Sequence, residues 1–173
     1  YHIKLRPGTN VAVLNMMLYF IIESKLHKED FILSRTEGFE NFVKEIKKLD
    51  IDHLAKVAGV DKQQVKEAAI AYASAKNSME FHGLGVTEQQ QGSKTVMLIA
   101  DLAMITGNIG RPGVGVNPLR GQNNVQGAAD MGCQPHQGAG YFPVADKKIQ
   151  NFYTEKYGVV HPTKAGLKIP EIF

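Results

Sequence analysis

The chain has 173 residues, of which 43% are hydrophobic and 21% are charged, and its formal net charge is +3. Its lysines are spread among glutamates and form no stripe, which argues against binding of nucleic acid. The single cysteine, Cys133, excludes a disulfide framework and cannot by itself hold zinc or an iron–sulfur cluster.

The longest apolar run, Val11–Ile22, has 12 residues, whereas a membrane span needs ~20. We therefore expect a buried helix there and no membrane insertion by this segment. The sequence begins at Tyr1 with no initiator methionine and ends without a polar tail. These ends suggest an internal fragment of a longer polypeptide. We expect a cytoplasmic location, with a periplasmic one still open.

The first half of the chain predicts helices. A turn at Arg6–Asn10, where Thr9 or Asn10 is placed to cap a helix, precedes a helix that runs to about Lys25. Further helical segments are expected at 27–33 and 36–48, from an Asp cap at residue 52 to Gly59, and from Asp61 to about residue 75.

The second half predicts one strand, at Ser78–His82, followed by a tight GLGV turn. An apolar helix is expected over Gln89–Ile105 and another at Lys147–Tyr157, with no clear period between them. We predict a helix-rich, three-layer α/β fragment whose small parallel sheet is incomplete and would be finished by segments outside the chain. Residues 1–122 are assigned to the C-terminal part of one α/β domain, and 123–173 to the start of a second, also incomplete.

Two motifs resemble nucleotide-binding sequences and fail. GLGVTE at Gly83–Glu88 has a glutamate where the dinucleotide fingerprint needs its third glycine. GSKT at Gly92–Thr95 lacks the glycine spacing of a P-loop. A glycine turn before a helix can nevertheless present backbone amides to a phosphate. The six histidines are scattered and are interpreted as surface or structural residues, with His82, beside the glycine turn, the strongest exception.

The stretch Gly107–Gly132 combines glycine with asparagine and glutamine and contains little charge. Glycine lets backbone approach a ligand closely, and carboxamides offer paired donors and acceptors to a heterocycle. Arg120 offers a bidentate fork for an oxyanion, whereas Arg111 is expected to be an ordinary solvated charge. The composition predicts the wall of a pocket for a large polar cofactor.

NPLRGQNNVQGAADMG (Asn117–Gly132) closely resembles the catalytic alpha subunit of molybdenum- or tungsten-dependent formate dehydrogenases. LRPGTNVAVLN, SRTEGFENF, GLGVTEQQQG and LAMITGNIGRPGVGVNP follow the same family in order, so the resemblance covers residues 1–157. Nitrate reductases typically have a GQPNAMG-like sequence where this chain has RGQNNVQG, and Arg120 is the mark of the formate dehydrogenases.

The resemblance implies oxidation of formate to CO2, or the reverse, at molybdenum or tungsten held by two molybdopterin guanine dinucleotides. It implies that Arg120 is the catalytic anchor for formate. The residues that it assigns to cofactor binding are Gly8, Thr9, Asn10, Leu84, Gly85, Glu88 and Gln122. The family more often has Met and Gln at positions 84 and 88.

The metal ligand, its neighbouring histidine and the cysteines of a [4Fe–4S] cluster have no counterpart here, so we assign no metal ligand in this chain. The resemblance places those parts upstream, with electron-transfer subunits as partners, and the isolated chain is expected to be inactive. Two alternatives remain: another molybdopterin oxidoreductase, and a self-standing nucleotide-binding or accessory module. We expect Arg120 to be buried and to need an anionic partner, either formate or, as a structural ion pair, Asp130.

Overall fold

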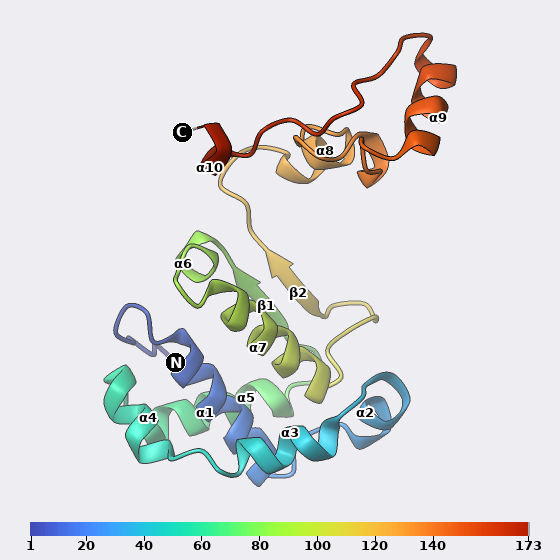
Figure 1. The fold of residues 1–173 in the computed structure, drawn as a ribbon. Coiled ribbons are helices and arrows are strands. Elements are labelled where there is room, and N and C mark those ends of the chain that lie inside the picture. Colours follow the sequence, from blue (N-terminus) through green and yellow to red (C-terminus); the bar gives the residue numbers. More distant parts are fainter. Residues whose placement is uncertain (173) are drawn as a thin grey trace. The chain divides into compact units, whose positions relative to one another are not determined.

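The computed structural model describes residues 1–172, which divide into two compact units, one over residues 1–119 and the other from Arg120 onward. The boundary predicted from sequence lay between residues 122 and 123. Unit 1 contains seven helices and two strands (Figure 1): α1 (Asn10–Glu23), α2 (Glu29–Arg35), α3 (Phe39–Ile46), α4 (Ile51–Ala58), α5 (Lys62–Ser74), β1 (Met79–His82), α6 (Leu84–Thr87), α7 (Gly92–Ile105) and β2 (Gly115–Pro118).

The two strands form a parallel sheet whose register runs from Met79 opposite Gly115 to His82 opposite Pro118. A helix-rich α/β fold with a small parallel sheet is therefore confirmed. The sequence predicted only one strand, and β2 supplies a parallel partner for it within the chain. Sequence patterning could not find β2, since Gly115–Pro118 contains a glycine, an asparagine and a proline, which strands disfavour.

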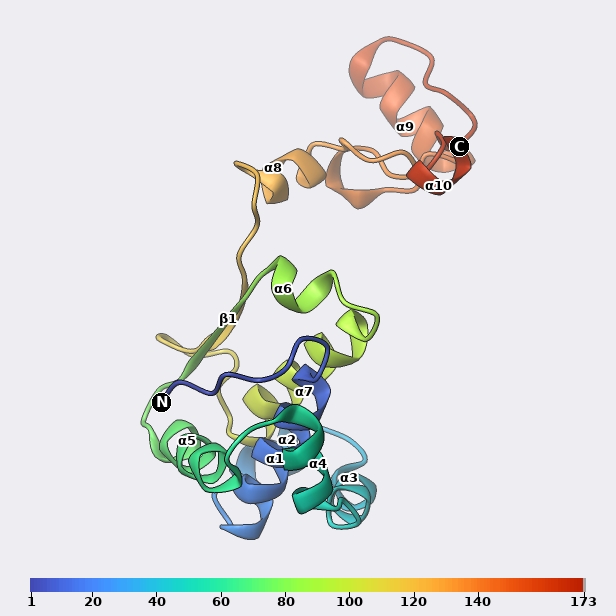
Figure 2. The ribbon, with the colours of Figure 1, turned by 90° about the vertical axis from the view of Figure 1, so that its left-hand side faces the viewer.

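The helices of unit 1 lie on one side of this sheet (Figure 2). Helix α7 contacts both strands and also packs along α1, which in turn contacts α3, α4 and α5. The layers therefore run from the sheet through α7 to α1. Helix α1 supplies much of the core because its apolar residues are distributed all round the helix, as expected of a helix enclosed by others; Met16, Leu18 and Ile21 are fully buried.

Several predicted boundaries need correction. Thr9 stands at the N-cap position of α1 but makes no capping bond, because its hydroxyl donates to the carbonyl of Arg6. The cap of α4 is Asp50, whose carboxylate accepts from the amide of His53, and not Asp52. Asp61 caps α5 as predicted. Helix α2 begins and ends two residues later than expected, α3 occupies only the middle of the predicted 36–48 segment, and α7 begins at Gly92 instead of residue 89.

Unit 2 contains α8 (Val125–Asp130), the 3-10 helix η1 (Ala139–Tyr141), α9 (Lys147–Tyr157) and α10 (Ile169–Ile172). Helix α9 has the predicted bounds, since Asp146 caps its start and a left-handed Gly158 ends it. Helix α8 was not predicted. None of the helices within residues 1–172 has the length and hydropathy that crossing a membrane requires.

Candidate functional site

The carboxyl ends of β1 and β2 meet at one edge of the sheet. The carbonyl of His82, the last residue of β1, accepts a 2.7 Å hydrogen bond from the amide of Leu119, directly after β2. In open parallel sheets, ligands bind outside this edge because the loops that leave it can surround them. The edge is therefore where a site is expected in unit 1.

The turn before α1 is held firmly in place. The amide and hydroxyl of Thr9 both donate to the carbonyl of Arg6, at 3.2 and 2.6 Å, and the amide of Arg6 donates to Ala58 at the end of α4. Gly8 has a φ of +83°, a left-handed conformation that glycine adopts without strain, and a Cβ there would meet no atom within 4 Å. The turn therefore presents open backbone just before Asn10, the first residue of α1.

The GLGV segment after β1 is one turn of helix, α6, and not the tight turn predicted from sequence. The amides of Val86 and Thr87 both return to the carbonyl of Gly83, which closes the helical turn. Leu84 is 46% exposed, and Gly85 and Glu88 are exposed as well. An apolar side chain displayed beside open backbone can pack against a flat ligand, so this segment suits the predicted role.

The turn before α1, helix α6 and the start of α7 lie at the same end of unit 1 in both views, the end toward which β1 and β2 run (Figures 1 and 2). Helix N-termini carry partial positive charge and unpaired amides, which favour anions. Six residues predicted from sequence are brought to this end: Gly8, Thr9, Asn10, Leu84, Gly85 and Glu88.

Arg120 and Gln122 are the first residues of unit 2, together with Gly121, and both side chains are exposed. The expectation of a buried Arg120 is wrong for this chain, because its side chain is exposed where unit 2 begins. Within residues 1–172 the guanidinium of Arg120 makes no hydrogen bond or ion pair. Arg120 therefore carries a permanent positive charge, and its hydrogen-bond donors are unoccupied in the described residues.

Asp130, the structural partner considered for Arg120, is engaged elsewhere. Its carboxylate accepts from the hydroxyl of Tyr141 at 2.5 Å and from the amide of Gln126 at 2.8 Å. The hydrogen bond from Tyr141 lowers the pKa of Asp130, and the same bond raises the pKa of Tyr141. The described residues therefore show no Arg120–Asp130 ion pair.

A polar cluster that the sequence did not reveal lies at the amino end of β1. Asn108 is 2% exposed; its carbonyl oxygen accepts from the amide of Ser78 at 3.2 Å and from Arg111 at 2.9 Å, and its amide donates to Thr106 at 2.9 Å. Arg111 also bonds Asn77 and the carbonyls of residues 76 and 107. The prediction that Arg111 is an ordinary solvated charge is therefore wrong, because its guanidinium donates to four acceptors in unit 1.

Strand β1 itself carries a part-buried carboxylate, Glu80, and a buried imidazole, His82. Glu80 accepts a hydrogen bond from Tyr72, while its second carboxylate oxygen is buried without a partner in the described residues. Burial raises the pKa of Glu80, which the bond from Tyr72 opposes. His82 is 7% exposed and its Nδ1 likewise has no partner in the part of the chain that the structure describes. The last residue of β1 thus retains a buried polar atom without a partner in the described residues.

Comparison with known proteins decides the family. The model of the family described as molybdopterin oxidoreductase matches residues 1–166. The chain belongs to this family. It is 42% identical to formate dehydrogenase H of Escherichia coli over 99% of its own length, and 43% identical, also over 99%, to the F420-dependent formate dehydrogenase subunit alpha of Methanocaldococcus jannaschii. It spans 24% and 25% of those two proteins.

Other members of the family are also similar. The chain is 32% identical to the assimilatory nitrate reductase catalytic subunit of Bacillus subtilis over 91% of its length, which is 22% of that protein. Among solved structures, the acetylene hydratase from Pelobacter acetylenicus matches with a TM-score of 0.60 and 22% identity, over 64% of this chain and 15% of that one. This last likeness shows the fold alone.

The sheet edge fits the cofactor that gives the family its name. The open backbone at Gly8 and the helix N-termini supply donors and space of the kind that a phosphate-bearing heterocycle requires. Within residues 1–172, no three His, Cys, Asp or Glu side chains gather as a metal site would require.

Proposed function

We propose that the chain is the central part of a molybdopterin-dependent formate dehydrogenase alpha subunit, which oxidises formate to CO2 or catalyses the reverse. The observation that carries this proposal is Arg120, an exposed guanidinium with no partner in residues 1–172, set in a glycine and carboxamide sequence that resembles the formate dehydrogenases. The similarity of 42–43% to two formate dehydrogenases over nearly the whole chain supports it.

Formate is a small anion with one C–H bond to break, so its anchor must orient it as well as neutralise it. The planar fork of arginine binds both carboxylate oxygens, whereas lysine supplies charge without orientation. An arginine whose fork is already satisfied by protein could not do this without breaking a bond. Arg120 is available in this chain, and Arg111, the other arginine in the glycine-rich stretch, is not.

The cofactor of the complete enzyme is proposed to be bis-molybdopterin guanine dinucleotide carrying molybdenum or tungsten. When bound, it supplies the acceptor for the two electrons released from formate. Gly8, Thr9 and Asn10 would hold a guanine nucleotide end and Gln122 would contact a pterin. Leu84, Gly85 and Glu88 would line the cofactor beside α6, where the carboxylate of Glu88 can accept from a guanine N–H edge.

The matched relatives are about four times as long as this chain, and the rest of the catalytic machinery is proposed to lie in the remaining sequence. That part would contain the metal ligand and a [4Fe–4S] cluster and would meet electron-transfer subunits. We propose a cytoplasmic enzyme. The isolated 173-residue chain is proposed to oxidise no formate.

The second candidate is a different oxidoreductase of the same family. The observation that favours it is the 32% identity to a nitrate reductase catalytic subunit. Nitrate is also a planar anion that an arginine can bind. Assaying the full-length product for formate oxidation and for nitrate reduction separates the two candidates.

The test of the Arg120 role is Arg120→Lys in the full-length product. Loss of the oriented fork should lower kcat/KM for formate ten- to a thousandfold, from ~1.5–4 kcal/mol of lost binding, with cofactor content near normal. Arg111→Lys is the matched control, since it should destabilise unit 1 yet leave kcat/KM per bound metal unchanged. An Arg120→Lys enzyme that keeps its kcat/KM would show that the residue does not bind substrate.

A further inference from the structure

Unit 2 has almost no core of its own. Among residues 120–172 only Gln150 and Tyr153 are buried, whereas unit 1 buries a continuous apolar cluster. Large apolar side chains stand exposed in unit 2, among them Met131 at 73% and Val160 at 86%. Segments of about this size are only marginally stable by themselves, because they bury a small fraction of their surface. One cysteine in the whole chain excludes an internal disulfide.

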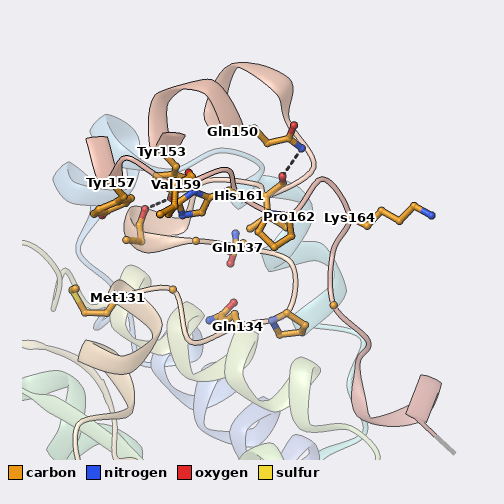
Figure 3. A pocket seen from close by; sticks show the side chains of 16 residues that line it. Met131, Gln134, Gln137, Gln150, Tyr153, Tyr157, Val159, His161, Pro162 and Lys164 are labelled. Atoms are coloured by element: carbon orange, nitrogen blue, oxygen red, sulfur yellow. Dashed lines mark hydrogen bonds between the residues drawn. The ribbon is translucent and has the colours of Figure 1, made fainter. Parts of the chain in front are cut away.

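The exposed apolar surface surrounds a formed groove of about 690 Å³, which we call the aromatic groove; its lining includes Met131, Pro135, Tyr153, Tyr157, His161 and Pro162 (Figure 3). The rings of Tyr153 and His161 lie 5.1 Å apart, and those of Tyr157 and His161 lie 5.7 Å apart. The hydroxyl of Tyr153 donates to the carbonyl of Ala139 at 2.5 Å. The groove is therefore built by specific contacts.

The polar groups of the groove are mostly neutral. Figure 3 shows the side chains of Gln134 and Gln137 projecting into the space between the segment at Met131 and the ring cluster. The Gln137 amide donates to the carbonyl of Tyr141 at 3.2 Å, and Gln134 makes no side-chain hydrogen bond within the described residues. A free carboxamide matches the donor and acceptor of a peptide bond, and the lining contains a single charged side chain, Lys164.

The extent of the exposed surface points to a polypeptide and not to a small molecule. Phe142, Phe152 and Val160 are 44%, 43% and 86% exposed, and none of the three lines the groove. A small ligand in the groove could not also cover these side chains. Apolar patches of this kind are typical of surfaces that another protein segment covers.

We propose that the aromatic groove is a docking surface for an apolar polypeptide segment from the remainder of the same subunit. The proposal rests on the proposed function, in which this chain is part of a longer catalytic subunit. It commits to the same subunit because the matched relatives carry about three quarters of their length outside the matched region, which provides such segments without a second protein.

Residues 159–165 provide a direct readout. None of their backbone amides donates a backbone hydrogen bond in the described residues, while the amide of Gly166 bonds the carbonyl of Pro135 at 2.6 Å. If nothing covers the groove, the amides of 159–165 should exchange with deuterium at close to the rate of an unfolded peptide. If a segment docks there, they should exchange at least a hundredfold more slowly.

The experiment is hydrogen exchange with mass spectrometry on the full-length product, as wild type and as Tyr157→Lys and Glu155→Lys. Both variants place a lysine on α9, but only position 157 lines the groove. Tyr157→Lys should accelerate exchange of 159–165 at least tenfold, and Glu155→Lys should leave it within about twofold. If Tyr157→Lys does not fold, Met131→Lys, which also lines the groove, is compared with Glu155→Lys in its place. The exchange rate of residues 159–165 in the wild type tests the proposal without any variant.

Three results would overturn the proposal. One is fast wild-type exchange of residues 159–165. Another is equal exchange in the two lysine variants. The third is protection that appears only when a separate protein chain is added or the protein concentration is raised. Formate oxidation is measured in parallel: a protected groove without formate oxidation refutes the proposed function alone, and formate oxidation with an unprotected groove refutes the docking alone.

Discussion

Replacing Asn108 tests whether the polar cluster at the amino end of β1 stabilises unit 1. The side chain is 2% exposed and makes three hydrogen bonds, to the amide of Ser78, the guanidinium of Arg111 and the hydroxyl of Thr106. Asn108→Ala leaves the Ser78 amide and the Thr106 hydroxyl without this partner in a part-buried or buried setting, at ~1–1.5 kcal/mol each. Arg111 is exposed and regains water, so its bond adds only ~0.5 kcal/mol.

The expected loss is therefore about 3 kcal/mol in the free energy of unfolding, measured by urea denaturation followed by far-ultraviolet circular dichroism. With a denaturant slope of ~2 kcal/mol/M, the midpoint should fall by ~1.5 M. The matched control is Asn41→Ala, since Asn41 is exposed on α3 and makes no side-chain hydrogen bond in the described residues. It should change stability by less than ~0.5 kcal/mol. A loss below ~1 kcal/mol for Asn108→Ala would refute the reasoning.

Three further changes test other parts of the chain. Gly92→Ala would place a Cβ 2.2 Å from the carbonyl oxygen of Thr87 and should lower the free energy of unfolding by more than ~2 kcal/mol, measured by urea denaturation. Gly85→Ala, whose Cβ would meet no atom within 4 Å, should be near neutral, so equal urea midpoints for the two variants would contradict the prediction. Burial raises the pKa of Glu80, so its contribution to stability is present below the ordinary glutamate pKa and is lost as pH rises through the raised pKa. Glu80→Gln should therefore reduce the decline in the free energy of unfolding above about pH 4.5, measured by urea denaturation at a series of pH values. An unchanged decline would show that another group titrates. In the full-length product, Asn10→Leu should lower pterin content measured after cofactor extraction; normal content would leave Asn10 with a local role at the start of α1.

Helix periodicity and capping chemistry determined much of unit 1 and α9. Asp61 and Asp146 each cap a helix through their own side chains, an interaction between residues two apart, so neither depends on the rest of the fold. The strand β1 was found because it is a short β-forming run before a glycine. Local signals of this kind need no tertiary contact.

The strand β2 and the role of Arg111 could not be predicted. Gly115–Pro118 becomes a strand because β1 lies beside it, and its own residues disfavour that conformation. Arg111 is 34 residues from Asn77 in sequence, and their bond exists only after the turn past α7 folds against the start of β1. Exposure of Arg120 is equally a tertiary outcome.

Sequence by itself determined the family, the helical segments with side-chain caps, and the residue types of the candidate site, because each of these is carried by neighbours along the chain. Tertiary structure decided which of those residues share the carboxyl edge of the sheet, which arginine is already engaged by protein, and that unit 2 leaves an aromatic groove uncovered. The physical reason is that burial and partner choice are set by contacts between residues far apart in sequence, to which local patterns contribute little.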